Sequence, residues 1–454
     1  MARPATTTPG NAARVLRIVH EGGPVSRAEL TRRTSLNRST VLAIVGELVD
    51  QGLVHEEFPV PGGPGADRPS AGVGRPSPIV RASADVVAAA VTVEIDAVGV
   101  ALVALDGTVR DRLVEPQAAV PGAADAVDAV ARVLGALTAR AAPGLRVVGV
   151  GVAVPGIVRV EDGVVRDAPH LGWRDEPFAG VLGERLGLPV RAANDANLGA
   201  WAERLYGSAR GVDDLVYLNG GASGIGGGIV SAGRPFSGAD GYAGELGHTF
   251  VAANGIRCHC GAVGCLETEA SRDALTAVTG TAPDDLDALA TALAEGRPEV
   301  EQVVDRQVTA LATAIRNAVH TVDPEVVVLG GFLGELLGHV GDRVEHEVRA
   351  QTMAAMTDRL RVVPSALGRD VLVRGAAELG FADLLRDGQA AAPAATAAPA
   401  ATAARAGTAA RAGTAAPAAT APTTATTTAP PAAPPTTPTT TSDRDDAVEE
   451  ARSA

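Results

Sequence analysis

Cysteine, lysine and aromatic residues are scarce or missing in this chain of 454 residues. It has three cysteines and no lysine, and aromatic residues make up only 2% of it. So few cysteines suit a protein of the reducing cytoplasm rather than a disulfide-stapled one. Because lysine is missing, every basic side chain is an arginine, which we attribute to codon usage and not to chemistry.

Long apolar runs and an excess of positive charge are also lacking. No stretch of about 20 apolar residues is free of charges and turn formers, so no membrane span is expected. Residues 1–10 are polar and contain proline, which predicts a flexible segment without a secretory signal. The net charge of −14 excludes a general polyanion binder, so any contact with nucleic acid must come from a local patch.

The sequence does contain enough apolar material for several packed domains. Hydrophobic residues make up 46% of the chain, and its length suggests two or three domains. From about residue 386 to residue 454 the chain turns into Ala/Thr/Pro repeats with a charged end. This segment lacks large apolar residues, so we expect it to be disordered and assign it no activity.

Residues 11–84 have the spacing of a winged helix-turn-helix domain. Apolar residues recur at helical spacing in three short segments. The second segment begins at a capping box formed by Ser26 and Glu29, and the third is capped by Asn37 or Ser39. Three short helices in this order are typical of DNA-binding domains.

A wing is expected after the third helix. Short strands are predicted at residues 53–55 and 79–81, on either side of a Gly/Pro-rich stretch between residues 59 and 78. Arg75, in this stretch, is placed to enter a minor groove.

Positive charge gathers locally around the predicted turn. Residues 27–38 hold four arginines against one glutamate, a net charge of +3 in an acidic protein. Short polar side chains at the start of the third helix suit phosphates and base edges in the major groove. A small helical domain for protein interactions is the alternative. The predicted DNA contacts are Arg27, Arg38, Ser39, Thr40 and Arg75.

Strands and helices alternate over residues 85–385, which predicts an α/β fold with ligands at the carboxyl ends of strands. The expected strands are residues 86–93, 99–105, 147–154, 188–193, 215–218, 227–230 and 325–329.

All three cysteines fall within eight positions, and His248 lies ten residues before the first of them. The set His248, Cys258, Cys260 and Cys265 offers three thiolates and one imidazole, which suits one structural zinc per chain. An incidental cluster of buried cysteines is the alternative. Glu245 and Glu267 flank the set, so the metal loop is expected to organise a polar ligand site.

Two further motifs stand at predicted strand ends. Asn194 and Asp195 lie at a strand-to-helix junction, where they suit a polyol, or else form an ordinary N-cap pair. Residues 223–228 form a glycine-rich turn whose amides suit a phosphate, although such turns are common. The phosphate residues of this loop are Ser223, Gly224, Gly226 and Gly227.

Together these motifs resemble the ROK family (repressors, open reading frames and kinases), over residues 11 to about 385. Two of the motifs, residues 245–248 and 258–267, are highly specific. The resemblance implies an actin-like, ribonuclease-H-like fold of two lobes with a boundary near residue 190 and sugar in the cleft. It implies zinc on the set named above. It implies sugar contacts at Asn194, Asp195, Glu245, His248 and Glu267.

One departure from the family pattern separates two functions. Kinases of the family carry Asp-x-Gly-Gly-Thr in the first hairpin turn, where small backbone admits the phosphates of ATP. This chain has residues 92–96 there, and two carboxylates, Glu94 and Asp96, would repel a triphosphate. If the chain were a kinase, the resemblance would make Asp195 the catalytic base; otherwise we expect no catalytic residue.

We therefore expect a sugar-responsive transcriptional regulator, a repressor of carbohydrate genes in the regulator branch of the family. Its partners would be operator DNA, a sugar or sugar derivative, and further copies of itself as a homodimer or homotetramer. An ATP-dependent sugar kinase with an appended DNA-binding domain is the alternative, and a protein-binding adaptor is a third.

Overall fold

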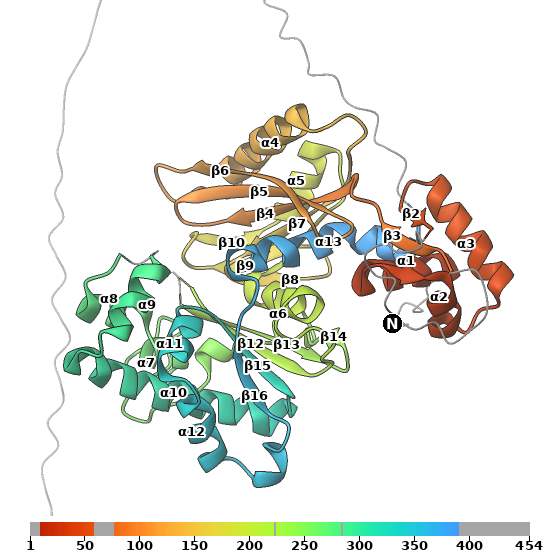
Figure 1. Ribbon diagram of the computed structural model, residues 1–454. Coiled ribbons are helices and arrows are strands. Elements are labelled where there is room, and N and C mark those ends of the chain that lie inside the picture. The colour runs from red at the N-terminus through yellow and green to blue at the C-terminus, as the bar shows by residue number, and fades with distance from the viewer. Residues whose placement is uncertain (1–9, 59–76, 222–223, 283–284, 390–454) are drawn as a thin grey trace, which may run out of the picture. The chain divides into compact units, whose positions relative to one another are not determined.

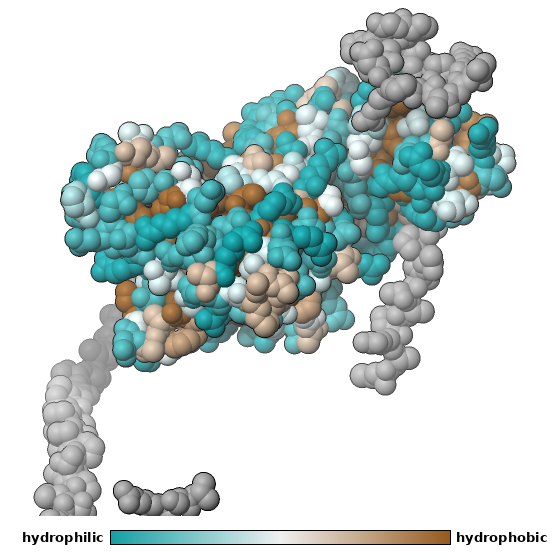
Figure 2. Space-filling model, turned by 60° about the horizontal axis from the view of Figure 1, so that its bottom comes forward, coloured by the Kyte–Doolittle hydropathy of each residue, from teal (hydrophilic) through white to brown (hydrophobic). Residues whose placement is uncertain are grey.

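The computed structural model describes residues 10–58, 77–221, 224–282 and 285–389. The predicted flexible start, most of the Gly/Pro-rich wing with Arg75, Ser223 and the Ala/Thr/Pro-rich tail lie outside these ranges. None of the helices within them combines the length and the apolar character needed to span a membrane. On the face shown in Figure 2, hydrophobic residues form small patches among hydrophilic ones.

The predicted winged helix is confirmed. Ser26 accepts a hydrogen bond from the Glu29 amide at 3.2 Å, and Asn37, rather than Ser39, caps the third helix by accepting from the Thr40 amide at 2.8 Å. A two-residue strand, too short to leave a sequence pattern, completes the sheet in the order β1-β3-β2. The elements are α1 (Asn11–Gly22), β1 (Val25–Ser26), α2 (Arg27–Thr34), α3 (Arg38–Asp50), β2 (Val54–Glu57) and β3 (Ile79–Ala82).

The first five-stranded sheet has the order β11-β7-β4-β5-β6. Strands β11, β7 and β4 run parallel, whereas β4, β5 and β6 form an antiparallel meander. Its strands are β4 (Val86–Val93), β5 (Ala97–Ala104), β6 (Val109–Pro116), β7 (Arg146–Val154) and β11 (Val190–Asn194). Helices α4 (Ala123–Arg140) and α5 (Phe178–Leu186) pack on one face and α13 (Val371–Asp387) on the other (Figure 1).

Alternation along β4 explains why both faces are covered. Val87 and Val91 belong to the core under α4, while Ala88 and Ala90 belong to the core that α13 closes. A strand buried on both sides reads as a continuous apolar run, as the sequence does.

A small sheet of order β10-β9-β8 follows β7 and was not predicted. Its strands are β8 (Ile157–Arg159), β9 (Val164–Ala168) and β10 (Trp173–Glu176).

The second five-stranded sheet has the order β14-β13-β12-β15-β16. Its strands are β12 (Leu215–Gly220), β13 (Ile225–Ser231), β14 (Arg234–Pro235), β15 (Val326–Gly331) and β16 (Arg361–Pro364). Helix α6 (Asp195–Tyr206) packs on one face and the remaining helices cover the other. These helices are α7 (Leu266–Glu269), α8 (Arg272–Thr279), α9 (Leu286–Ala294), α10 (Pro298–Val322), α11 (Phe332–Val340) and α12 (Arg343–Gln351).

The expected strands are all present, with small differences at their ends, whereas β6, β14 and β16 were not predicted. The glycine-rich turn was predicted too long, because β13 begins at Ile225 and not at residue 227. Gly226 and Gly227, both assigned to the phosphate loop, pair with Asn219 and Leu218 of β12, and for Gly227 this agrees with the strand expected at residues 227–230. Short 3₁₀ helices occupy Leu246–His248, Ala354–Met356 and Gly368–Asp370.

Candidate functional site

The site begins where β11 ends and α6 starts. Asn194 caps α6, because its side-chain oxygen accepts a hydrogen bond from the Asn197 amide at 3.0 Å. Its Nδ2 donates to the Gly156 carbonyl at 3.1 Å, which holds the end of the neighbouring strand β7 in place. The N-cap interpretation of this residue is therefore confirmed, and one N–H of its amide stays available to a ligand.

Asp195 follows as the first residue of α6. Its Oδ1 accepts a hydrogen bond from the Ala196 amide at 2.8 Å. Burial, opposed by that hydrogen bond and reinforced by the charges of Glu245 and Glu94, raises the pKa of Asp195 to about 6. A carboxylate that loses hydration in this way is a strong acceptor for a hydroxyl proton.

A cavity of about 670 Å³ opens beside Asp195. All five residues predicted to contact sugar line it: Asn194, Asp195, Glu245, His248 and Glu267. Glu245 borders the cavity, and partial burial there raises its pKa, with His248 opposing and Glu267 adding to the shift. The structure thus brings together five polar side chains that come from three separate segments of the chain.

The same cavity has lining residues that the sequence analysis missed. His170, Trp173 and Arg174 line it from β10 and the turn before it. One of only two tryptophans in the chain stands here, next to Gly172, which has a φ of +68°. In the sequence, this rare aromatic residue beside a turn glycine was the signal that could have identified the missed lining residues.

The cysteine cluster forms beside the cavity, on the loop between Phe250 and Cys265, which are joined by a β-bridge. The ligand atoms of His248, Cys258, Cys260 and Cys265 all lie within 4.8 Å of one another. The Cys260 and Cys265 sulfurs are 3.7 Å apart, and the Cys258 sulfur is 3.5 Å from His248 Nδ1.

These distances test the fit of a tetrahedral metal. With Zn–S bonds of about 2.3 Å and a Zn–N bond of about 2.05 Å, two sulfurs lie about 3.8 Å apart and sulfur and nitrogen about 3.5 Å. A disulfide would need a separation of about 2.05 Å, so Cys260 and Cys265 are not bonded to each other. These two separations match a tetrahedral metal, and the structure brings the four predicted ligands together as a candidate metal-binding cluster.

Glu267 links this cluster to the cavity. Its side chain is 7% exposed, and its Oε1 lies 2.9 Å from the Cys258 sulfur and 3.4 Å from His248 Nδ1. It lies over Gly224, where an added Cβ would come within 2.5 Å of its other oxygen. His259 lies beside them: its Nδ1 is 3.1 Å from Glu267 Oε1, and both residues line the cavity.

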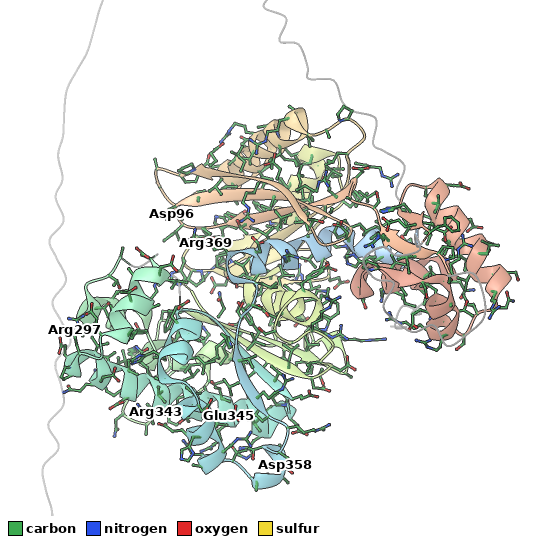
Figure 3. All side chains as sticks on the ribbon, in the orientation of Figure 1. Asp96, Arg297, Arg343, Glu345, Asp358 and Arg369 are labelled. Atoms are coloured by element: carbon green, nitrogen blue, oxygen red, sulfur yellow. The ribbon has the colours of Figure 1, made fainter. Side chains whose placement is uncertain are left out.

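A second cavity, of about 740 Å³, shares the lining residue Asn219 with the first. Glu94 lines it at the β4–β5 turn, where Asp96 is labelled in Figure 3. Burial, followed by the charge of Asp96, raises the pKa of Glu94. A carboxylate therefore lines this cavity at the β4–β5 turn, and the predicted Ser223 lies outside the described residues.

The side chains predicted to contact DNA differ in whether they are free or already held by other residues of the chain. Arg38 is exposed at the start of α3 and forms no ion pair with the rest of the described chain. Arg27 is held by an ion pair with Glu56 of β2, and the Ser39 hydroxyl donates to Asn37 at 2.7 Å. Thr40 offers its side chain, because only its amide is used by the cap. Arg75 lies outside the described residues.

Comparison with known proteins places this geometry in context. A glucokinase from Thermotoga maritima is 35% identical over 252 residues, 51% of this chain and 78% of the relative. A putative xylose repressor from Caldicellulosiruptor sp. is 28% identical over 403 residues, 83% of this chain and 96% of the relative.

A solved structure also matches over most of the chain. The crystal structure of a ROK family transcriptional regulator, a homolog of the E. coli MLC protein, matches with a TM-score of 0.69 and 28% identity. The match covers 83% of this chain and 96% of that one. The ROK family model matches residues 91–382, and the MarR family model matches residues 7–63. The chain therefore belongs to the ROK family, with a MarR-type winged helix preceding the actin-like ROK fold.

Proposed function

We propose that this protein is a sugar-responsive, DNA-binding transcriptional regulator that acts as a repressor of carbohydrate genes. One observation carries the proposal: the same chain holds a winged helix with a free arginine, Arg38, and a cavity lined by five polar residues. Similarity to a putative xylose repressor and to a ROK family regulator, each over 83% of this chain, supports it. Because operator DNA is its partner, we place the protein in the cytoplasm.

The sugar site would work by hydrogen bonding. Asp195 and Glu245 accept hydrogen bonds from sugar hydroxyls, and Asn194 donates its remaining N–H. His248 and Glu267 complete the ring of polar contacts. For regulation, the sugar must bind the DNA-competent and DNA-incompetent states with different affinities.

The main test uses fluorescence anisotropy of a labelled DNA duplex selected from random sequence with the full chain. Addition of neutral sugars, one at a time, should identify at least one that changes the DNA affinity by five-fold or more. A protein that selects no DNA sequence would contradict the regulator. If the protein binds DNA but no sugar changes its DNA affinity, only the sugar-responsive part of the proposal is contradicted.

DNA contacts are proposed at Arg38 and Thr40, with Ser39 and Arg27 contributing once released from their partners and Arg75 entering from the wing. Arg38→Ala should weaken DNA binding and lower the slope of log affinity against log salt by about 1 if Arg38 meets a phosphate. Arg110→Ala, an exposed arginine on β6, is the matched control and should change neither quantity.

The domain division is part of the proposal. Residues 11–84 would form the DNA-binding domain and residues 85–385 the two-lobed sugar-binding domain, with a lobe boundary near residue 190. Deletion of residues 1–84 should abolish DNA binding and leave a folded body that still binds sugar. Because operators for winged helices have two-fold symmetry, we propose a homodimer or homotetramer, which light scattering can test.

A structural zinc is proposed for the cluster of one histidine and three cysteines. It would hold the loop that carries Glu267 into the cavity, and it would supply no chemistry to the sugar. Elemental analysis of protein purified without a metal-affinity resin should give one zinc per chain. A metal content of zero in folded protein would remove zinc from the proposal.

A sugar kinase is the second candidate. The pKa of Asp195, raised to about 6, suits a general base, and the Thermotoga maritima relative is a glucokinase. Glu94 opposes it, because a carboxylate at the β4–β5 turn would face the phosphates of ATP. A coupled assay with ATP, magnesium and a sugar panel separates the two: turnover that Asp195→Asn abolishes would establish the kinase.

A further inference from the structure

A buried polar cluster joins the winged helix to the sugar-binding body. His20, near the end of α1, is 3% exposed. Its Nδ1 lies 2.6 Å from the Leu105 carbonyl oxygen, and its Nε2 lies 3.1 Å from both oxygens of Glu378 in α13. The Tyr206 hydroxyl donates to the same Glu378 at 2.5 Å. Three elements, α1, α13 and α6, therefore meet in one cluster.

The geometry fixes the charge of His20. Both ring nitrogens face oxygen acceptors, and only the imidazolium carries a hydrogen on each nitrogen. Burial alone would lower the pKa of His20, but the charge and hydrogen bond of Glu378, with the Leu105 carbonyl, raise it to about 9. The cluster is therefore a buried ion pair with an added phenol, and breaking it leaves charged groups unpaired.

Helix α6 connects this cluster to the sugar site. It has 12 residues, so it is about 18 Å long. Asp195, its first residue, lines the sugar cavity, and Tyr206, its last, reaches Glu378. Helix α6 therefore has its first residue in the sugar cavity and its last residue in the buried polar cluster.

The helix cannot slide independently of α13. Gly375 of α13 packs so closely on α6 that an added Cβ would come within 2.3 Å of the Leu198 carbonyl oxygen. Arg374 of α13 lies over the Tyr206 ring, 5.4 Å from its centre, and donates to the Gly107 carbonyl at 2.8 Å. A displacement at the Asp195 end is therefore passed to the Tyr206 end and to α13 together.

We propose that α6 and the His20–Glu378–Tyr206 cluster transmit occupancy of the sugar cavity to the winged helix. This inference rests on the proposed function and names its regulation. With the cluster intact, the winged helix is docked on α13 through α1. A sugar held by Asp195 shifts α6, which changes the hydrogen bond of Tyr206 to Glu378 and alters the docking of His20.

The test measures three quantities in the full chain with Tyr206→Phe, which removes one hydroxyl. Sugar affinity, measured by calorimetry with a sugar active on wild type, should stay within about two-fold of wild type. DNA affinity without sugar should move toward the value that wild type has with saturating sugar, because the hydrogen bond from Tyr206 to Glu378 is missing. The change in DNA affinity caused by saturating sugar should fall by five-fold or more. Tyr242→Phe, which removes a hydroxyl outside the cluster, is the matched control and should keep the full response.

The outcomes separate this inference from the proposed function. If wild type shows no DNA binding or no sugar response, the function itself fails. If wild type responds and both Tyr206→Phe and Glu378→Gln respond as strongly, the cluster does not transmit. Hydrogen exchange of residues 11–22 in wild type gives a measurement that needs no variant. Sugar should change the exchange rate there, and an unchanged rate would overturn the inference.

Discussion

Replacement of Asp195 by asparagine should make the unliganded protein more stable while it loses its sugar response. The carboxyl has a pKa of 3.8 in the unfolded chain and about 6 in the folded protein. The folded state therefore binds more protons between these values, so this group lowers stability as pH rises from about 4 to 6. Above pH 6 the ionised carboxylate destabilises the fold by up to about 3 kcal/mol, from 1.36 kcal/mol per unit.

Asp195→Asn removes the cost of burying a charge and keeps an oxygen that can accept the hydrogen bond from the Ala196 amide. In urea unfolding followed by circular dichroism, the variant should exceed wild type by up to about 3 kcal/mol at pH 7. Its advantage in free energy of unfolding should grow by about 1.4 kcal/mol between pH 5 and pH 8, as the wild-type carboxyl completes its ionisation. Asp358→Asn, an exposed change labelled in Figure 3, is the control and should have a small effect at either pH.

The same variant should bind the effector sugar roughly ten- to a hundred-fold more weakly, because a hydrogen bond to a charged acceptor contributes about 1.5–3 kcal/mol. Basal DNA binding should be kept. If the variant is less stable than wild type at pH 7, or if its gain in free energy of unfolding does not change with pH, burial does not destabilise the ionised Asp195. Unchanged sugar affinity would remove Asp195 from the site.

Three further predictions concern the metal cluster, the interdomain ion pair and the effector. Cys265→Ala, or a strong chelator, should remove the zinc, lower the midpoint of thermal unfolding and weaken sugar binding in calorimetry. If only the midpoint changes, the metal does not support the sugar site. His20 has a folded pKa of about 9 against 6.5 unfolded, so its stabilisation is complete below pH 6.5. About 3 kcal/mol of it should be lost as pH rises to 9, and His20→Gln should flatten this dependence in urea titrations. Sugar 6-phosphates should bind less tightly than the parent sugars, because Asp195 and Glu245 line the cavity, and tighter binding of a phosphate in calorimetry would contradict this electrostatic argument.

What the sequence predicted correctly depends on short separations along the chain. The metal cluster could be predicted because its four ligands lie within residues 248–265, so their spacing is visible directly. Caps such as Ser26 and Asn37 are also local, since each accepts a bond from an amide three residues ahead. Buried strands such as β4 and β7 stand out as continuous apolar runs.

Contacts between distant segments were not predictable in this way. His20 and Glu378 are 358 positions apart, and in each helix the residue looks like an isolated polar side chain on an apolar face. Strands β8 and β10 are too short to show alternation, so His170 and Trp173 were not assigned to the cavity. The glycine-rich loop was overextended because glycine marks a turn or a close approach equally well, and Gly226 serves the latter, facing Ala196 of α6.

The packing of α1 against α13 has a consequence for the order in which the protein is made. Arg17 of α1 donates to the Leu385 carbonyl at 3.3 Å, and Leu16 shares a core with Phe381. At synthesis rates of about 5–20 residues per second, the ribosome completes α13 roughly 20 to 70 s after α1. During that interval the winged helix lacks its contacts with α13, although its contact with Leu105 can already form. A chain that ends before α13 would therefore contain the winged helix and most of the sugar-binding body, but not the contacts between α1 and α13 that dock one on the other.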